Sequence, residues 1–159
     1  MSGRLLLLGL ALAALDAGPA AAETARVWEV NGIRLEPAQV ERLASDIASQ
    51  TVRAVGRLEG LALREEQSDA LEGVYREVAL DTYDQVVAVV NRGDLSDAAK
   101  ETEVKRLVIE GQERSSLRVG EILDGAQYAT YRAWEERQVD AFRERGLWSS
   151  GRRTRRGRR

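Results

Sequence analysis

The feature that most constrains the fold is an apolar period of about 3.6 residues, which runs with short breaks from Glu36 to Arg145. Such a period gathers apolar side chains on one face of an α-helix, and that face must be buried against another element. Short connections between successive segments favour antiparallel neighbours. The sequence therefore predicts an all-α fold of four amphipathic helices, in an antiparallel bundle or an open, curved arrangement of helical hairpins. The periodic segments cover residues 40–55, 71–90, 96–122 and 124–145.

Several residues mark where these helices begin and end. Asn91-Arg92-Gly93 suits the end of the second helix, because Asn and Gly accept a left-handed conformation. Ser96 is a favoured N-cap for the third helix. The third segment has the weakest apolar stripe, since Gly111, Ser115 and Ser116 in its middle offer little apolar bulk.

The N-terminus has the order of a secretory signal peptide. A basic residue precedes an almost unbroken run of Leu and Ala over 5–15, and Gly18-Pro19 comes before three Ala residues. A basic start, an apolar run of about 7–15 residues and a small-residue cleavage site are typical of such a signal. Asp16 leaves the run well short of the roughly 20 apolar residues of a membrane-spanning helix. We predict a signal peptide over 1–22, cleaved after Ala22, and a soluble periplasmic mature protein.

Residues 23–35 form a predicted extended or turn segment before the helices. Asn31-Gly32, flanked by two short apolar runs, is the strongest short signal for a β-hairpin. A lone two-stranded hairpin is only marginally stable in water, so it must dock on the helices or remain a loose turn. The sequence leaves both open and slightly favours the turn.

Charge divides the chain into two unlike parts. Residues 23–151 contain 17 basic and 25 acidic residues, whereas six of the last eight residues are Arg. An acidic body argues against a nucleic-acid or anionic-membrane surface on the folded part. We predict a helical domain over 36–148 and a disordered tail over 149–159, which has nothing to bury.

The arginine tail has several interpretations. The default is a solvated tail without a specific role. Attraction to an anionic envelope surface comes next, because each Arg near a negative surface adds about 1 kcal/mol. Nucleic-acid binding is expected only in the test tube, and folding back on the acidic body as a salt-sensitive lid is a further alternative. The candidate residues for anionic-surface binding are Arg152, Arg153, Arg155, Arg156, Arg158 and Arg159.

Composition argues against most catalytic and metal sites. The chain has no His and no Cys, so catalysis with a histidine base, disulfides and soft-metal sites lack their residues. Adjacent carboxylates such as Glu65-Glu66 and Glu135-Glu136 do not face each other on a helix, and we predict them to be solvated. Weak Ca²⁺ binding stays open, although residues 94–103 lack EF-hand spacing. We expect no enzyme, no cofactor and no metal site.

A Leu-x-x-x-Gln pattern occurs at three predicted helix starts. In the last copy, Asp124 and Gln127 suit the N-cap and N3 positions of a capping box, and Leu123 with Tyr128 suits a hydrophobic staple. In the first copy Pro37 suits the first helical position. The second copy has no capping side chain at its N-cap. The residues of these helix-start motifs are Leu35, Gln39, Leu63, Gln67, Leu123, Asp124 and Gln127.

This motif resembles the LTxxQ motif of the Spy/CpxP family of periplasmic proteins. The last copy continues as Tyr128-Ala-Thr-Tyr131-Arg-Ala-Trp134, and a signal peptide followed by a helical chain is similar too. None of the three copies has Thr after the Leu. The resemblance implies a thin, curved, all-helical homodimer that binds unfolded or misfolded envelope proteins without ATP, or that regulates envelope stress signalling.

Five aromatic residues are candidates for partner binding. Helical spacing favours the alternative that Tyr131, Trp134 and Phe142 are core. Trp148 lies beyond the fourth predicted helix, where exposure or a dimer contact suits it best. The candidate partner-binding residues are Tyr128, Tyr131, Trp134, Phe142 and Trp148.

The function predicted from these features is that of an exported binding protein. It would hold unfolded or other envelope proteins on a partly apolar surface lined by the second and fourth helical segments. One alternative is a structural or tethering protein, anchored to an anionic envelope surface by its arginine tail. Another is a regulator that docks on a sensor protein. No nucleic-acid partner is expected in vivo.

Overall fold

The computed structural model describes residues 28–30, 33–145 and 147, and among these the side chains from residue 36 onward. Its described part is an all-α domain of four helices with a small hairpin in front, as the apolar period predicts. The predicted signal peptide and arginine tail lie outside the described residues. The helices are α2 (Pro37–Val55), α3 (Glu65–Val90), α4 (Asp97–Ile122) and α5 (Gly125–Arg143).

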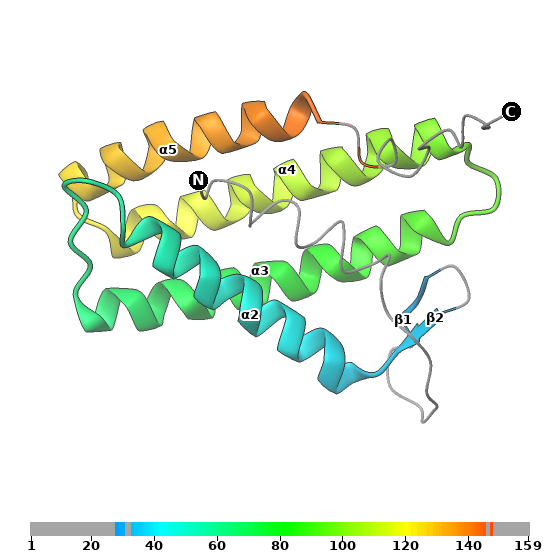
Figure 1. Cartoon of the computed structure of the whole chain (residues 1–159), viewed down its shortest axis with the longest axis horizontal. Helices are drawn as coiled ribbons and strands as arrows, with labels where there is room; N and C mark the ends of the chain where they lie inside the picture. Colours follow the sequence, from blue (N-terminus) through cyan, green and yellow to red (C-terminus); the bar gives the residue numbers. More distant parts are fainter. Residues whose placement is uncertain (1–27, 31–32, 146, 148–159) are drawn as a thin grey trace, which may run out of the picture.

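Helix α3 is the centre of the arrangement and packs against both α2 and α4. Helices α3, α4 and α5 run antiparallel, each to the one before it, and α2 crosses them obliquely (Figure 1). The backbone of α5 lies closest to α4, and its Tyr131 and Trp134 are buried in the second apolar cluster together with residues of the other three helices. None of the described helices is both long and apolar enough to span a membrane.

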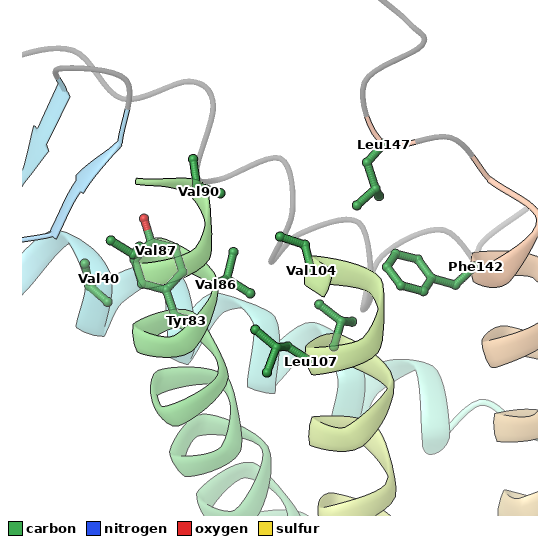
Figure 2. Packing of buried hydrophobic residues seen from close by; sticks show 10 residues of the cluster. Val40, Tyr83, Val86, Val87, Val90, Val104, Leu107, Phe142 and Leu147 are labelled. Atoms are coloured by element: carbon green, nitrogen blue, oxygen red, sulfur yellow. The ribbon is translucent and has the colours of Figure 1, made fainter. Parts of the chain in front are cut away.

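Among the described residues the core consists of two apolar clusters, and all four helices contribute to each. The first cluster lies near the connection between α3 and α4, where Val40, Val86, Val104 and Phe142 come from four different helices (Figure 2). The second lies at the other end of the bundle, where both the α2–α3 and the α4–α5 connections are found. Its buried members are Ala48, Val55, Leu61, Leu71, Tyr75, Val119, Leu123, Tyr131 and Trp134.

A layer of small and polar residues at the middle of α4 separates the two clusters. Gly111, Gln112, Ser115 and Ser116 are all buried there. A methyl group at Gly111 would collide with the hydroxyl of Thr82 on α3. The weak apolar stripe of this segment therefore has a packing reason, since small residues let α3 and α4 approach closely.

The hairpin forms, so the slight preference of the sequence for a loose turn is wrong. Strands β1 (Trp28–Val30) and β2 (Ile33–Leu35) pair antiparallel, with Val30 opposite Ile33. Strand β1 also contacts α3. That docking is the condition under which a two-stranded hairpin becomes stable.

Candidate functional site

The last Leu-x-x-x-Gln copy forms the predicted capping box at the start of α5. Oδ1 of Asp124 accepts the backbone N–H of Gln127 at 2.9 Å, and Oε1 of Gln127 accepts the backbone N–H of Asp124 at 3.1 Å. Leu123 is buried, and the half-buried Tyr128 packs against the same apolar cluster. The cap of this helix is therefore formed by local interactions.

The other two copies use only the glutamine half of this arrangement. Oε1 of Gln67 accepts the backbone N–H of Arg64 at 3.1 Å, and Oε1 of Gln39 accepts that of Glu36 at 2.8 Å. Arg64 offers no side-chain acceptor, so one side of a capping box is missing. All three motif glutamines therefore cap their own helices.

The second and third copies also meet each other in the interior. Nε2 of Gln67 donates to Oε1 of Gln127 at 2.8 Å and to the carbonyl of Ile122 at 3.0 Å. Nε2 of Gln127 donates to the carbonyl of Ala62 at 2.8 Å and to Oε1 of Gln67 at 3.3 Å. Each amide thus reaches the carbonyl five residues before the other glutamine. We call this nearly two-fold arrangement the glutamine clasp.

The clasp joins the α2–α3 connection to the α4–α5 connection, although its glutamines are 60 residues apart. Both glutamines are buried, and each amide group has its oxygen and nitrogen occupied. The first copy takes no part, because Gln39 is exposed at the start of α2. The side chain of Leu35 lies outside the described ones. The three copies look equivalent in the sequence, and the structure brings only two of them together.

A second buried polar group surrounds Glu135 on α5, which we call the carboxylate cluster. Oε1 of Glu135 accepts from Nε2 of Gln112 at 2.8 Å and from the Tyr131 hydroxyl at 2.9 Å. Oε2 accepts from the Ser116 hydroxyl at 2.7 Å and forms an ion pair with Arg132. The cluster holds α5 to the polar layer of α4.

The prediction of a solvated Glu135-Glu136 pair is wrong for Glu135. Glu135 is 2% exposed, whereas the side chain of Glu136 is 67% exposed. The signal for burial lies in the helical period, because Glu135 is four residues after Tyr131 and directly follows Trp134. Sequence reasoning missed it because two of the four polar partners of Glu135, Gln112 and Ser116, come from α4.

Burial also determines the protonation of the tyrosines in the core. Burial, the nearby Tyr75 hydroxyl and the Glu135 carboxylate together hold the pKa of Tyr131 well above its usual value. Tyr131 therefore keeps the proton that it donates to Glu135. In the first apolar cluster, burial raises the pKa of Tyr83 to about 12.

Most of the predicted partner-binding aromatics belong to the core. Tyr131, Trp134 and Phe142 are buried, which favours the core alternative over an exposed binding surface. The ring of Tyr128 stacks on that of Tyr131 at 6.2 Å between centroids and lies against Gly120. Trp148 lies outside the described residues, as do Arg152, Arg153, Arg155, Arg156, Arg158 and Arg159.

The described surface is mainly charged and polar. Among the described side chains, Leu117 on α4 is the only large apolar one that is exposed, and it is 73% exposed. A groove of about 430 Å³ lies between α3 and α4. Two ion pairs cross between these helices there, Arg114–Asp81 at 2.8 Å and Arg118–Glu77 at 2.9 Å.

A second groove, of about 260 Å³, lies between α4 and α5 and has a polar lining. Four carboxylates and two guanidinium groups line it, with Glu113, Glu136 and Asp140 exposed to solvent. Within the described part of the chain, no three Asp, Glu, His or Cys residues are grouped as metal ligands would be. Both grooves present charged side chains, with Val78 and Leu80 as apolar lining in the first and Val139 in the second.

Comparisons of the chain with protein-family models, curated proteins and solved structures gave no match. The resemblance to the Spy/CpxP family stays a prediction from the motif residues.

Proposed function

We propose that the mature chain is a non-enzymatic binding protein of the cell envelope, which holds other proteins, unfolded ones included, on the surface of its helices. The observation that supports this most directly is the glutamine clasp. It makes two copies of the family-like motif into one structural unit at the end of the bundle. All polar atoms of the clasp are occupied, which suits a rigid scaffold for binding better than a catalytic site.

The part of the scaffold best suited to a partner is the face shared by α3 and α4. Leu117 lies three residues after Arg114, so it is a neighbour of that groove residue on the exposed surface of α4, although it does not line the groove itself. Half-buried Val78 and Leu80 supply apolar lining, and the two interhelical ion pairs supply charge. The sequence predicts a surface lined by the second and fourth segments; this surface keeps the second segment and replaces the fourth, whose Tyr131, Trp134 and Phe142 are core.

A regulator that docks on one sensor protein is the second candidate function. The observation that favours it is the small size of the exposed apolar surface, since Leu117 stands alone among charged residues. A single apolar residue among fixed ion pairs favours one partner in one orientation, rather than affinity for many partners. The family-like homodimer and the tether through the arginine tail stay predictions.

The test is aggregation of a chemically unfolded model protein, in moderate salt, with the mature chain and with a form lacking residues 152–159. The proposal predicts that both forms suppress aggregation near equimolar ratio. Leu117→Asp should weaken suppression, whereas Ala133→Asp, an equally charged change at an exposed site on α5, should not.

Suppression by neither form, or only by the form with the tail, would contradict a holding function of the helical body. Stoichiometric capture of a single envelope protein, again weakened by Leu117→Asp, would instead identify the regulator.

A further inference from the structure

The groove between α4 and α5 has the charge to accept a basic segment. Its lining includes the carboxylates of Glu113, Glu136 and Asp140, in addition to Glu135 beneath them. The two guanidinium groups of the lining are already paired, Arg132 with Glu135 and Glu136, and Arg143 with Asp140. The carboxylates remain in excess, so the groove attracts cations.

The described chain ends close to this groove. Leu147 is buried in the first apolar cluster beside Phe142 (Figure 2), and its backbone N–H donates to Oε1 of Glu101 at 2.9 Å. These contacts hold Leu147 near the C-terminal end of α5, and residues 148–159 follow it in the sequence. Six of those residues are Arg, and the helical body is acidic.

We propose that the arginine-rich segment 152–159 binds in the α4–α5 groove of its own chain. Arg152 is the fifth residue after Leu147, and five extended residues span about 17 Å. The way back along α5 from Arg143 to Glu136 is seven residues, or about 10 Å at the helical rise. The first arginines therefore reach the carboxylates of the groove without disturbing the helices.

Tethering makes this interaction effective although its individual pairs are weak. Exposed ion pairs contribute little each and are screened by salt. A short linker gives the tail an effective concentration near the groove in the millimolar range. Occupancy of the groove should therefore fall with ionic strength, and an anionic surface should compete for the same arginines. This inference does not depend on the binding function proposed above.

Paramagnetic broadening in the full mature chain tests this placement. The chain has no Cys, so Thr154→Cys introduces a single thiol for a nitroxide label. At about 0.01 M salt, where the Debye length is about 30 Å, the label should broaden the backbone amide signals of residues 113, 136 and 140. At about 1 M salt, where the Debye length is about 3 Å, the broadening should disappear.

Two triple variants, each of which removes three negative charges, distinguish binding in this groove from general attraction of the tail to an acidic body. Glu113→Gln, Glu136→Gln and Asp140→Asn together should abolish the broadening. Glu65→Gln, Glu66→Gln and Asp69→Asn, at the exposed start of α3, should leave it intact. The proposal is overturned if low salt gives no broadening, if broadening is equal over all acidic faces, or if the α3 variant removes it. Circular dichroism of both variants establishes that the helices are retained.

Discussion

The glutamine clasp and the carboxylate cluster both hold helices together with buried polar side chains, yet they are built differently. The clasp is neutral, and each of its glutamines also caps its own helix. The carboxylate cluster carries charge, and two of its residues, Gln112 and Ser116, come from α4. When one helix moves, each glutamine loses its bonds across the clasp but keeps the bond to its own helix start. A buried carboxylate depends on every partner staying in place.

The largest expected effect is therefore in the carboxylate cluster. Glu135→Ala leaves Gln112, Tyr131 and Ser116 without their acceptor, and we expect a loss of about 3–5 kcal/mol in the free energy of unfolding. Urea denaturation followed by circular dichroism measures it. Glu136→Ala is the matched control, expected to change stability by no more than about 0.5 kcal/mol. Similar losses in the two variants would show that the cluster is not a stabilising unit.

The next effect is in the clasp. Gln67→Ala removes the cap on Arg64 and leaves Gln127 with unsatisfied groups, at an expected cost of about 2–3 kcal/mol. Gln39→Ala removes a cap alone, at an exposed helix start, and should cost about 1 kcal/mol or less. Thermal or urea unfolding of both variants compares them. If Gln39→Ala cost as much, capping alone would explain the motif.

A third expectation concerns the close approach of α3 and α4 in the polar layer. Gly111→Ala should destabilise by about 1–3 kcal/mol, because the added methyl meets Thr82. Thr82→Ala in the same chain should recover part of the loss. Gly73→Ala, on α3 with open space around its Cα, should stabilise by about 0.5–1 kcal/mol. If Gly111→Ala left the free energy of unfolding unchanged, α4 would not need a small residue at this position.

The smallest expected effect is a loss of stability at alkaline pH. The pKa of Tyr83 is raised by burial to about 12, from 10.0, so its contribution to stability is fully present below pH 10. It is lost as the pH rises from 10 to about 12, because the unfolded chain releases the proton first. At pH 11 the loss from this residue is about 1 kcal/mol. Tyr83→Phe should make the change in unfolding free energy between pH 9 and pH 11 smaller by that amount, and an unchanged pH dependence would contradict the burial.

How far the sequence predicts this molecule depends on how local each interaction is. The four helices and the capping box of Asp124 and Gln127 follow from neighbours within one turn, and both are present. The pairing of Gln67 with Gln127 and the burial of Glu135 do not follow, because their partners lie 60 and up to 23 residues away. Helical periodicity places a side chain on a face, but it does not identify the residue opposite.

The hairpin and the aromatic residues likewise depend on contacts with distant parts of the chain. Asn31-Gly32 favours a hairpin locally, but its stability comes from the contact of β1 with α3, which no local pattern contains. Tyr131 and Trp134 satisfy both a core and a binding interpretation in the sequence. Only the packing of α5 on the other helices assigns them to the core.

The central claim is that two distant copies of one motif act as a single unit through the glutamine clasp. A double-mutant cycle of Gln67→Ala and Gln127→Ala in urea unfolding tests it most directly. The account predicts that the two losses are not additive, with a coupling energy of about 1 kcal/mol or more, whereas a Gln39→Ala and Gln127→Ala cycle is additive. Additivity of the Gln67 and Gln127 losses within about 0.3–0.5 kcal/mol would contradict the claim.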